Sequence, residues 1–320
     1  IDLSLAFHTD AGIAADSTIG TLMIYSIADA ETLRVFPDGV SRLANRDLGD
    51  IIQTQIVNDI RLKYRPDWTR RALMDADYSE AWRPNVPACL LELLSHQNFT
   101  DMKYALSPQF RFDTSRSIYK GMLKFIATQN QYDYLVQPMP VSHFHAYFSD
   151  SAEVTLRWQP VPDPLEPTAI PENYVVYTRM EDGGFDNGTF VASNQFTFKN
   201  LRENVIYSFK VTAVNQGGES FPSENLSVCW IDTSLSPILI VNGFDRISPP
   251  EYVNEPNFKG FANFLDPGVA DKFNFNLTGS QFDFDPDSPY RTNDAPGHGA
   301  SQANFETKLI PGNSFDFPFI

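Results

Sequence analysis

Short apolar runs bounded by turn-forming residues mark the first part of the chain. They occupy residues 3–8, 20–25 and 87–93. Continuous apolar runs of this length, ending in polar or turn residues, are typical of buried strands. We therefore expect three strands of one sheet in this region.

Two longer stretches between and after these runs show helical periodicity. Residues 43–64 repeat leucine and isoleucine at helical spacing, and Ser41 precedes them as the expected N-cap. Residues 114–129 place four large apolar side chains on one face. Strands that alternate with long helices predict an α/β layer fold with a mostly parallel sheet.

The periodicity changes to alternation in the middle of the chain. Residues 154–158, 174–176, 196–198 and 207–213 alternate apolar and polar side chains. Short alternating segments separated by turn residues predict a β-sandwich of seven strands.

A third pattern begins near residue 236. Residues 238–246 start as an apolar strand and run into a polar loop, and 12 of the 26 phenylalanines follow residue 236. We predict three domains: an α/β domain at 1–136, a β-sandwich at 137–235, and the start of a third, α/β domain at 236–320. The chain begins without Met and without a leader-like segment, so we expect that it is part of a longer protein.

Charge and hydropathy exclude several classes of function. The chain carries 24 basic and 40 acidic side chains, a net charge of −16, which disfavours binding to nucleic acid or an anionic membrane through a basic surface. Mean hydropathy is −0.27, and no apolar run reaches the length needed to span a bilayer. Cys89 and Cys229 fall in different predicted domains, so we expect two buried thiols and no disulfide.

Two polar residues stand at strand positions where an α/β fold assembles its sites. His8 closes the first apolar run, and Glu92 lies inside the third. An ionised carboxylate is costly to bury unless it is paired, hydrogen-bonded or beside a metal. Glu92 is therefore either a functional residue or a structural acid that pairs with an arginine or caps a loop.

Other candidates are weaker. His96 follows Glu92 by four residues and either orients the site or bonds at the surface, whereas His143 and His145 share one strand face and are expected to be structural. Four further features have two interpretations each. Trp68 and Trp82 either stack on a sugar or pack inside the domain. Residues 283–294 form either a calcium loop or a solvated acidic loop, and residues 296–299 either supply a histidine ligand or form a turn, which is the better interpretation.

The middle segment resembles a fibronectin type III domain. The residues that carry the resemblance are Trp158, Tyr174, Leu201 six residues before Tyr207, and the alternating segment 209–218. In that family the tyrosine pins a strand crossover through its hydroxyl. The resemblance implies a spacer or display module without catalysis.

The first segment resembles the zinc-dependent N-acetylmuramoyl-L-alanine amidases of the type 3 class, which cleave the amide between peptidoglycan glycan and its stem peptide. Their motif S-[IL]-H-x-N-A is similar to SLAFHTDA at 4–11, G-x-x-x-Y to GTLMIY at 20–25, and P-A-x-L-x-E-x-G-F-x-x-N to PACLLELLSHQN at 87–98. The resemblance implies that His8 is a zinc ligand and Glu92 the catalytic carboxylate. Asp10 and His96 would support them.

The chain departs from the family pattern in three respects. Asp10 stands where the family has Asn, and Leu94 and Ser95 stand where it has Gly and Phe. The family's Gly-His-Gly-Gly strand and a helical glutamate have no counterpart before His8. A catalytic zinc takes three protein ligands, so the resemblance implies that an upstream segment of the same protein completes the site and that the amidase-like domain is incomplete at its N-terminus.

The domain order resembles large secreted proteins of Gram-negative bacteria, some of them labelled xanthan lyases. The leading hypothesis is a peptidoglycan amidase that is secreted, periplasmic or attached to the cell envelope. One alternative is an inactive surface protein that binds or displays an envelope glycan. A xanthan lyase-like protein is a further alternative, although lyases commonly need basic residues to neutralise a uronate, and the sequence shows no such cluster.

Overall fold

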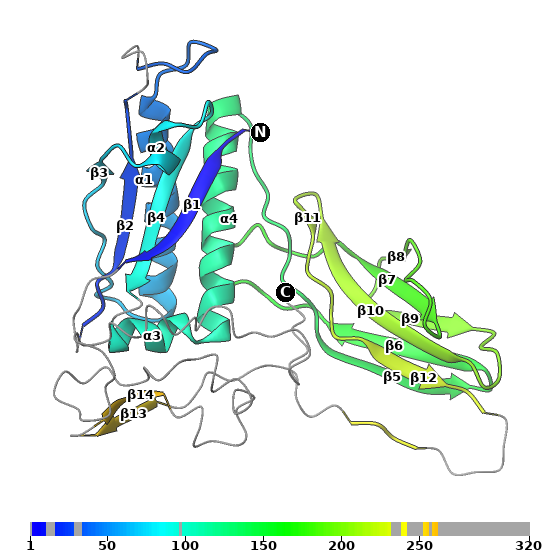
Figure 1. The fold of residues 1–320 in the computed structure, drawn as a ribbon. Coiled ribbons are helices and arrows are strands. Elements are labelled where there is room, and N and C mark those ends of the chain that lie inside the picture. Colours follow the sequence, from blue (N-terminus) through cyan, green and yellow to red (C-terminus); the bar gives the residue numbers. More distant parts are fainter. Residues whose placement is uncertain are drawn as a thin grey trace. The chain divides into compact units, whose positions relative to one another are not determined.

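The computed structural model describes residues 2–10, 17–28, 34–95, 98–231, 238–241, 252–255 and 258–261. The chain divides into two units, described separately below. The first contains residues 1–132 and the hairpin of β13 (Tyr252–Glu255) and β14 (Phe258–Phe261), and the second contains residues 133–246. Figure 1 shows a sheet with helices in the first unit and a β-sandwich in the second.

The first unit is built on a four-stranded sheet. Its strands are β1 (Ser4–Asp10), β2 (Thr21–Tyr25), β3 (Met74–Asp75) and β4 (Ala88–Ser95), in the order β1-β4-β2-β3. The pairs β1–β4 and β2–β3 are parallel, but β2 and β4 are antiparallel. The prediction of a mostly parallel sheet therefore holds for two of these three pairs. It did not anticipate the antiparallel central pair, because apolar spacing marks a strand without specifying its direction.

In the part of this unit that the structure describes, four helices accompany the sheet: α1 (Leu43–Lys63), α2 (Ser79–Trp82), α3 (Phe99–Ala105) and α4 (Pro108–Asn130). The helix expected at 114–129 begins six residues earlier, because the Ser107 hydroxyl accepts a hydrogen bond from the Phe110 amide and proline occupies the first helical position. The expected cap of α1 is displaced by one residue. Arg42 is the N-cap, while Ser41 accepts a bond from the Leu43 amide.

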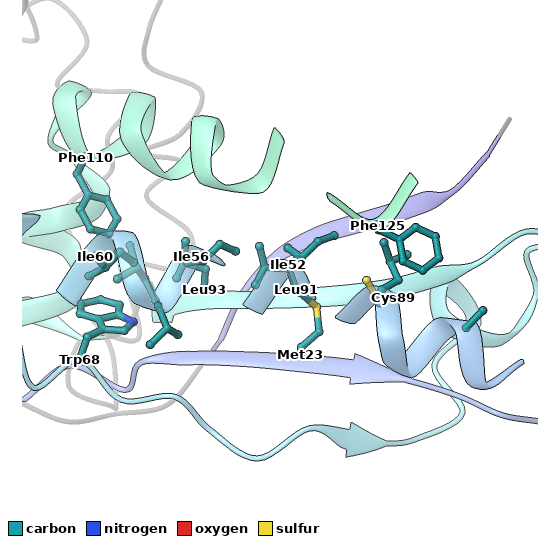
Figure 2. Close-up of a cluster of buried hydrophobic side chains, with 14 of the residues drawn as sticks. Met23, Ile52, Ile56, Ile60, Trp68, Cys89, Leu91, Leu93, Phe110 and Phe125 are labelled. Carbon is teal, nitrogen blue, oxygen red and sulfur yellow. The ribbon is translucent and has the colours of Figure 1, made fainter. Parts of the chain in front are cut away.

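The main core lies between α1, α4 and one face of the sheet (Figure 2). Met23, Leu91, Ile52 and Phe125 are all buried there, and each such side chain stabilises the fold by about 1.5–3 kcal/mol. Trp68 is also fully buried, and its indole N–H donates to the Thr21 hydroxyl at 2.9 Å. Trp68 therefore packs in the core and is not available to stack on a sugar.

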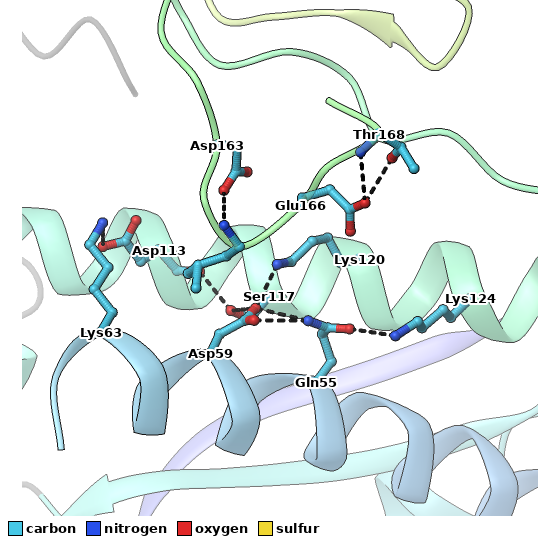
Figure 3. Close-up of polar contacts among 11 residues, drawn as sticks. Gln55, Asp59, Lys63, Asp113, Ser117, Lys120, Lys124, Asp163, Glu166 and Thr168 are labelled. Atoms are coloured by element: carbon cyan, nitrogen blue, oxygen red, sulfur yellow. Dashed lines mark hydrogen bonds and ion pairs between the residues drawn. The ribbon is translucent and has the colours of Figure 1, made fainter. Parts of the chain in front are cut away.

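A polar cluster joins α1 to α4 beside this core (Figure 3). The Asp59 carboxylate lies 2.7 Å from Lys120 Nζ, with both side chains almost fully buried. Ser117 donates to Asp59 at 2.6 Å, and Gln55 donates to both of its oxygens at 3.0 Å. Lys124 in turn donates to Gln55 at 2.9 Å. Every oxygen of Asp59 is therefore hydrogen-bonded, as a buried carboxylate requires.

The second unit is a two-sheet sandwich. One sheet contains β5 (Ser142–Asp150), β6 (Glu153–Gln159) and β9 (Gln195–Lys199); the other contains β7 (Asn173–Met180), β8 (Thr189–Val191), β10 (Ile206–Asn215), β11 (Gly218–Glu219) and β12 (Leu226–Cys229). Trp158, Tyr174 and Phe209 lie in its core. The Tyr207 hydroxyl accepts the Arg202 amide at 3.2 Å, which confirms the tyrosine that pins a crossover.

Two expectations for later residues are wrong. Residues 238–241, predicted as a strand, lie outside any helix or strand and are exposed, whereas residues 242–251 lie outside the described part. Cys89 is buried as expected, but Cys229 is exposed on β12 because it ends an edge strand. Both cysteines are free.

Candidate functional site

His8 and Glu92 are neighbours across the parallel pair β1–β4. His8 of β1 stands opposite Glu92 of β4 in the register of the two strands. Leu91 and Leu93 point into the core under α1 and α4, while Leu90 belongs to the small cluster on the other face. Because side chains alternate along a strand, Glu92 lies on the face away from the two long helices.

The Glu92 carboxyl group is partly buried. Its Oε2 atom is buried and has no hydrogen-bond partner among the described residues. Burial raises the pKa of Glu92, and the nearby Asp10 carboxylate raises it further, while His8 and Arg71 act in the opposite direction. A carboxylate with an unused buried oxygen beside a histidine is suited to accept a proton from a bound water or to face a metal.

His8 has a second acidic neighbour that sequence patterns did not reveal. Its Nε2 atom lies 4.0 Å from Oε1 of Glu80 on α2, and both side chains are partly exposed. This distance is too long for a hydrogen bond, so Glu80 adds a negative charge near His8 without fixing the orientation of the ring. Glu80 was missed because it lies in a polar four-residue helix with no periodic signal.

Asp10, predicted as a supporting residue, forms an ion pair. Its Oδ2 lies 2.5 Å from Nη1 of Arg71, in the segment before β3. Asp10 thus contacts an arginine close to the site instead of standing free beside His8. Arg71 was also missed, because 61 residues separate the partners.

The strand pair changes register directly after His8 and Glu92. Asp10 pairs with Ser95, so three steps along β4 match two along β1. Leu94 takes up the extra residue with φ +64°, a left-handed conformation that favours glycine. Leu94 stands at the position where the amidase pattern has glycine.

Gly20, directly before β2, occupies a position where the backbone leaves no space for a side chain. It has φ +84°, and a Cβ there would lie 2.2 Å from the Thr69 carbonyl oxygen. Any larger residue would push β2 away from the segment that precedes β3. The glycine of the second motif is therefore required by close backbone approach.

Asp101 is a buried acid that the sequence analysis did not single out. It is fully buried, and its Oδ2 accepts the amides of Ser95 at 2.8 Å and Ile19 at 3.3 Å. Its Oδ1 has no partner among the described residues, and burial raises its pKa to about 7. Asn98, the N-cap of α3, precedes it by three residues, and this cap spacing is the signal that points to Asp101.

We expect Asp101→Asn to stabilise the first unit at alkaline pH. The folded pKa of Asp101 lies above its value of 3.8 in the unfolded chain. Its contribution to stability is therefore complete below pH 4 and is lost as the pH rises through 7. The variant should melt about 3 °C or more above the wild type at pH 8 and close to it at pH 4. Calorimetry at both pH values tests this, and equal melting temperatures at pH 8 would contradict the assignment.

The remaining sequence candidates divide into described and undescribed residues. His143 and His145 are exposed on β5, and their structural role stays a prediction. His96, the turn at 296–299 and the acidic segment 283–294 lie outside the described residues. Within the described ranges, no group of three His, Cys, Asp or Glu side chains is arranged to hold a metal ion.

Comparison with known proteins decides the nature of the second unit. The family model of the fibronectin type III domain matches residues 139–228, the stretch that forms the sandwich with the Tyr207 corner. Residues 139–228 are a fibronectin type III domain. The match covers less than a third of the chain and leaves the α/β unit unassigned.

Solved structures that resemble the chain match over a similar share of its length. One is the twitchin kinase region of C. elegans, with 22% identity and a TM-score of 0.28 over 32% of this chain and 18% of that one. Another is the titin domains A168–A170, with 21% identity and a TM-score of 0.27 over 30% of this chain and 33% of that one. A third is the FN5 domain of Drosophila Lar, with 17% identity and a TM-score of 0.24 over 30% of this chain and 99% of that one. The chain thus spans about a fifth of the twitchin region. No curated protein matches the sequence.

In the described residues, none of the helices combines the length and apolar character that crossing a membrane requires.

Proposed function

We propose that the α/β unit belongs to a zinc-dependent amidase that cleaves the bond between N-acetylmuramic acid and the L-alanine of the peptidoglycan stem peptide. The observation that carries the proposal is the placement of His8 directly opposite Glu92 on one sheet face, with the Glu92 Oε2 buried and unpaired among the described residues. These are the two residues that the amidase motifs assign to metal binding and catalysis.

Two backbone features support the alignment with those motifs. Gly20 occupies a position where a side chain would collide with Thr69, and Leu94 adopts the left-handed conformation at a position where the family has glycine. A replaced glycine that keeps its glycine-like backbone is expected when the fold is retained and the residue has diverged.

The residues present fit part of a zinc site. His8, half-exposed at the edge of the described sheet, has the imidazole that zinc prefers, and the Glu80 carboxylate lies 4.0 Å from its Nε2 atom. A catalytic zinc takes three protein ligands, so the other two come from residues outside the described part, which we propose belong to an upstream segment. When bound, zinc polarises the amide carbonyl.

Glu92 supplies the proton transfers. Its carboxylate takes a proton from the attacking water, whose oxygen bonds to the amide carbon, and then gives that proton to the departing nitrogen as the carbon–nitrogen bond breaks. The products are a free lactyl carboxylate on the sugar and a free amino group on L-alanine. The raised pKa of Glu92 suits both halves of this exchange.

A second candidate is a surface protein that binds or displays an envelope glycan without cleaving it. It is favoured by the absence, among the described residues, of a complete metal-binding group. In that case the fibronectin type III domain would act as a spacer. Either function places the protein in the cell envelope or outside the cell.

Digestion of purified peptidoglycan by the full-length protein distinguishes these functions. We expect mass spectrometry to detect stem peptides with a free L-alanine amino group and glycan strands without peptide. Sedimentation of the protein with peptidoglycan and no soluble product would support the binding alternative. Unsaturated sugar ends on xanthan would support the lyase alternative, and the matched control is heat-inactivated protein.

A further inference from the structure

The end of β1 is held weakly by its own strand pairing. β1 forms the edge of the described sheet, with β4 as its neighbour. After His8 the register shifts, because Leu94 inserts an extra residue into β4 before Asp10 meets Ser95. A bulge therefore interrupts the hydrogen bonds between β1 and β4 directly after His8.

Arg71 holds this end of β1 from another part of the chain. Its guanidinium contacts the Asp10 carboxylate at 2.5 Å, with both side chains partly exposed. The Arg71 amide donates to the Thr21 carbonyl at 3.0 Å, and its own carbonyl accepts from Gln53 at 2.9 Å. Gln53 is fully buried in α1. The guanidinium therefore projects from a backbone that is fixed on both sides.

The charges near Glu92 give this contact a second effect. Asp10 lies close enough to Glu92 to oppose its ionisation. Without a cation, the two carboxylates would repel each other. Arg71 neutralises Asp10 and removes this repulsion.

We propose that Arg71 is a positioning residue, whose ion pair with Asp10 anchors β1 beyond the bulge and keeps His8 beside Glu92. The catalytic consequence rests on the proposed amidase function. The anchoring does not, so the two are tested by separate measurements.

The chain offers a matched control in the preceding residue. Arg70 also forms an ion pair, with its Nη2 2.5 Å from Asp50 Oδ1 on α1, but it does not contact β1 through that pair. We would compare Arg71→Met, Arg71→Lys and Arg70→Met in the full-length protein. Hydrogen exchange of peptides that cover β1 reports anchoring, and kcat and KM on a muropeptide report catalysis.

In Arg71→Met we expect hydrogen exchange near Asp10 to accelerate about tenfold. We expect kcat to fall about tenfold or more at nearly constant KM, because a small misplacement of a site residue lowers the rate of the chemical step strongly. Arg71→Lys should recover most of both, and Arg70→Met should change neither. Asp10→Asn combined with Arg71→Met should lose no more than the single variant.

Exchange in Arg71→Met equal to that in Arg70→Met would overturn the anchoring. Faster exchange with unchanged kcat would overturn the positioning role. If the wild type releases no peptide, the amidase proposal fails, and the exchange comparison alone decides whether Arg71 anchors β1.

Discussion

Glu92→Gln is expected to lower the rate of amide hydrolysis at least about a hundredfold while leaving bound zinc in place. The amide side chain has nearly the same shape as the carboxylate, but it cannot take the proton of the attacking water. Because Glu92 Oε2 has no partner among the described residues, the change breaks no hydrogen bond from those residues to this oxygen. Initial rates of peptide release from a muropeptide measure the effect.

The control for this change is Glu203→Gln, the same substitution at an exposed glutamate of the fibronectin type III domain. It should keep the wild-type rate, and both variants should melt close to the wild type. Wild-type turnover in Glu92→Gln would contradict the assignment of Glu92 as the catalytic carboxylate.

Lys120→Met should destabilise the α/β unit by about 3–5 kcal/mol. Methionine fills much of the space of the lysine stem, but the Asp59 carboxylate then keeps its burial and loses its cation at 2.7 Å. Gln55 and Ser117 still donate to Asp59, yet neutral donors do not replace a buried charge. Urea unfolding followed by circular dichroism of the helices gives the free energy of unfolding.

Lys63→Met is the comparison for Lys120→Met. Lys63 also bridges α1 and α4, with Nζ 2.7 Å from Asp113 Oδ2, but its side chain is 36% exposed. Water can replace an exposed ammonium, so the loss should be about 1 kcal/mol or less. Equal losses of unfolding free energy in the two variants would show that burial does not increase the contribution of the Asp59–Lys120 pair to stability.

Much of the α/β unit could be predicted from periodicity. The apolar runs at 20–25 and 87–93 mark β2 and β4, and helical spacing gives the end of α1 to within one residue. The alternation in the second unit, with Tyr207 as its corner, led directly to the fibronectin type III domain. These features depend on residues close together in the chain, so the spacing of apolar and polar residues is enough to predict them.

The parts that could not be predicted depend on contacts between distant residues. Arg71 and Glu80 reach the β1 residues Asp10 and His8 from segments more than 60 positions away, and no spacing rule links them. The direction of β2 relative to β4 is likewise a property of the assembled sheet. Asp101 is the intermediate case, because its place after the cap Asn98 is a local signal.

The most direct test of the proposed site is the zinc content of the full-length protein, measured by elemental analysis against its intact mass in the wild type, Glu92→Gln and His8→Ala. The account predicts about one zinc per chain in the wild type and in Glu92→Gln, and a large loss in His8→Ala, because His8 is a ligand and Glu92 is not. A full-length wild type without zinc, or a His8→Ala variant that keeps it, would contradict the account.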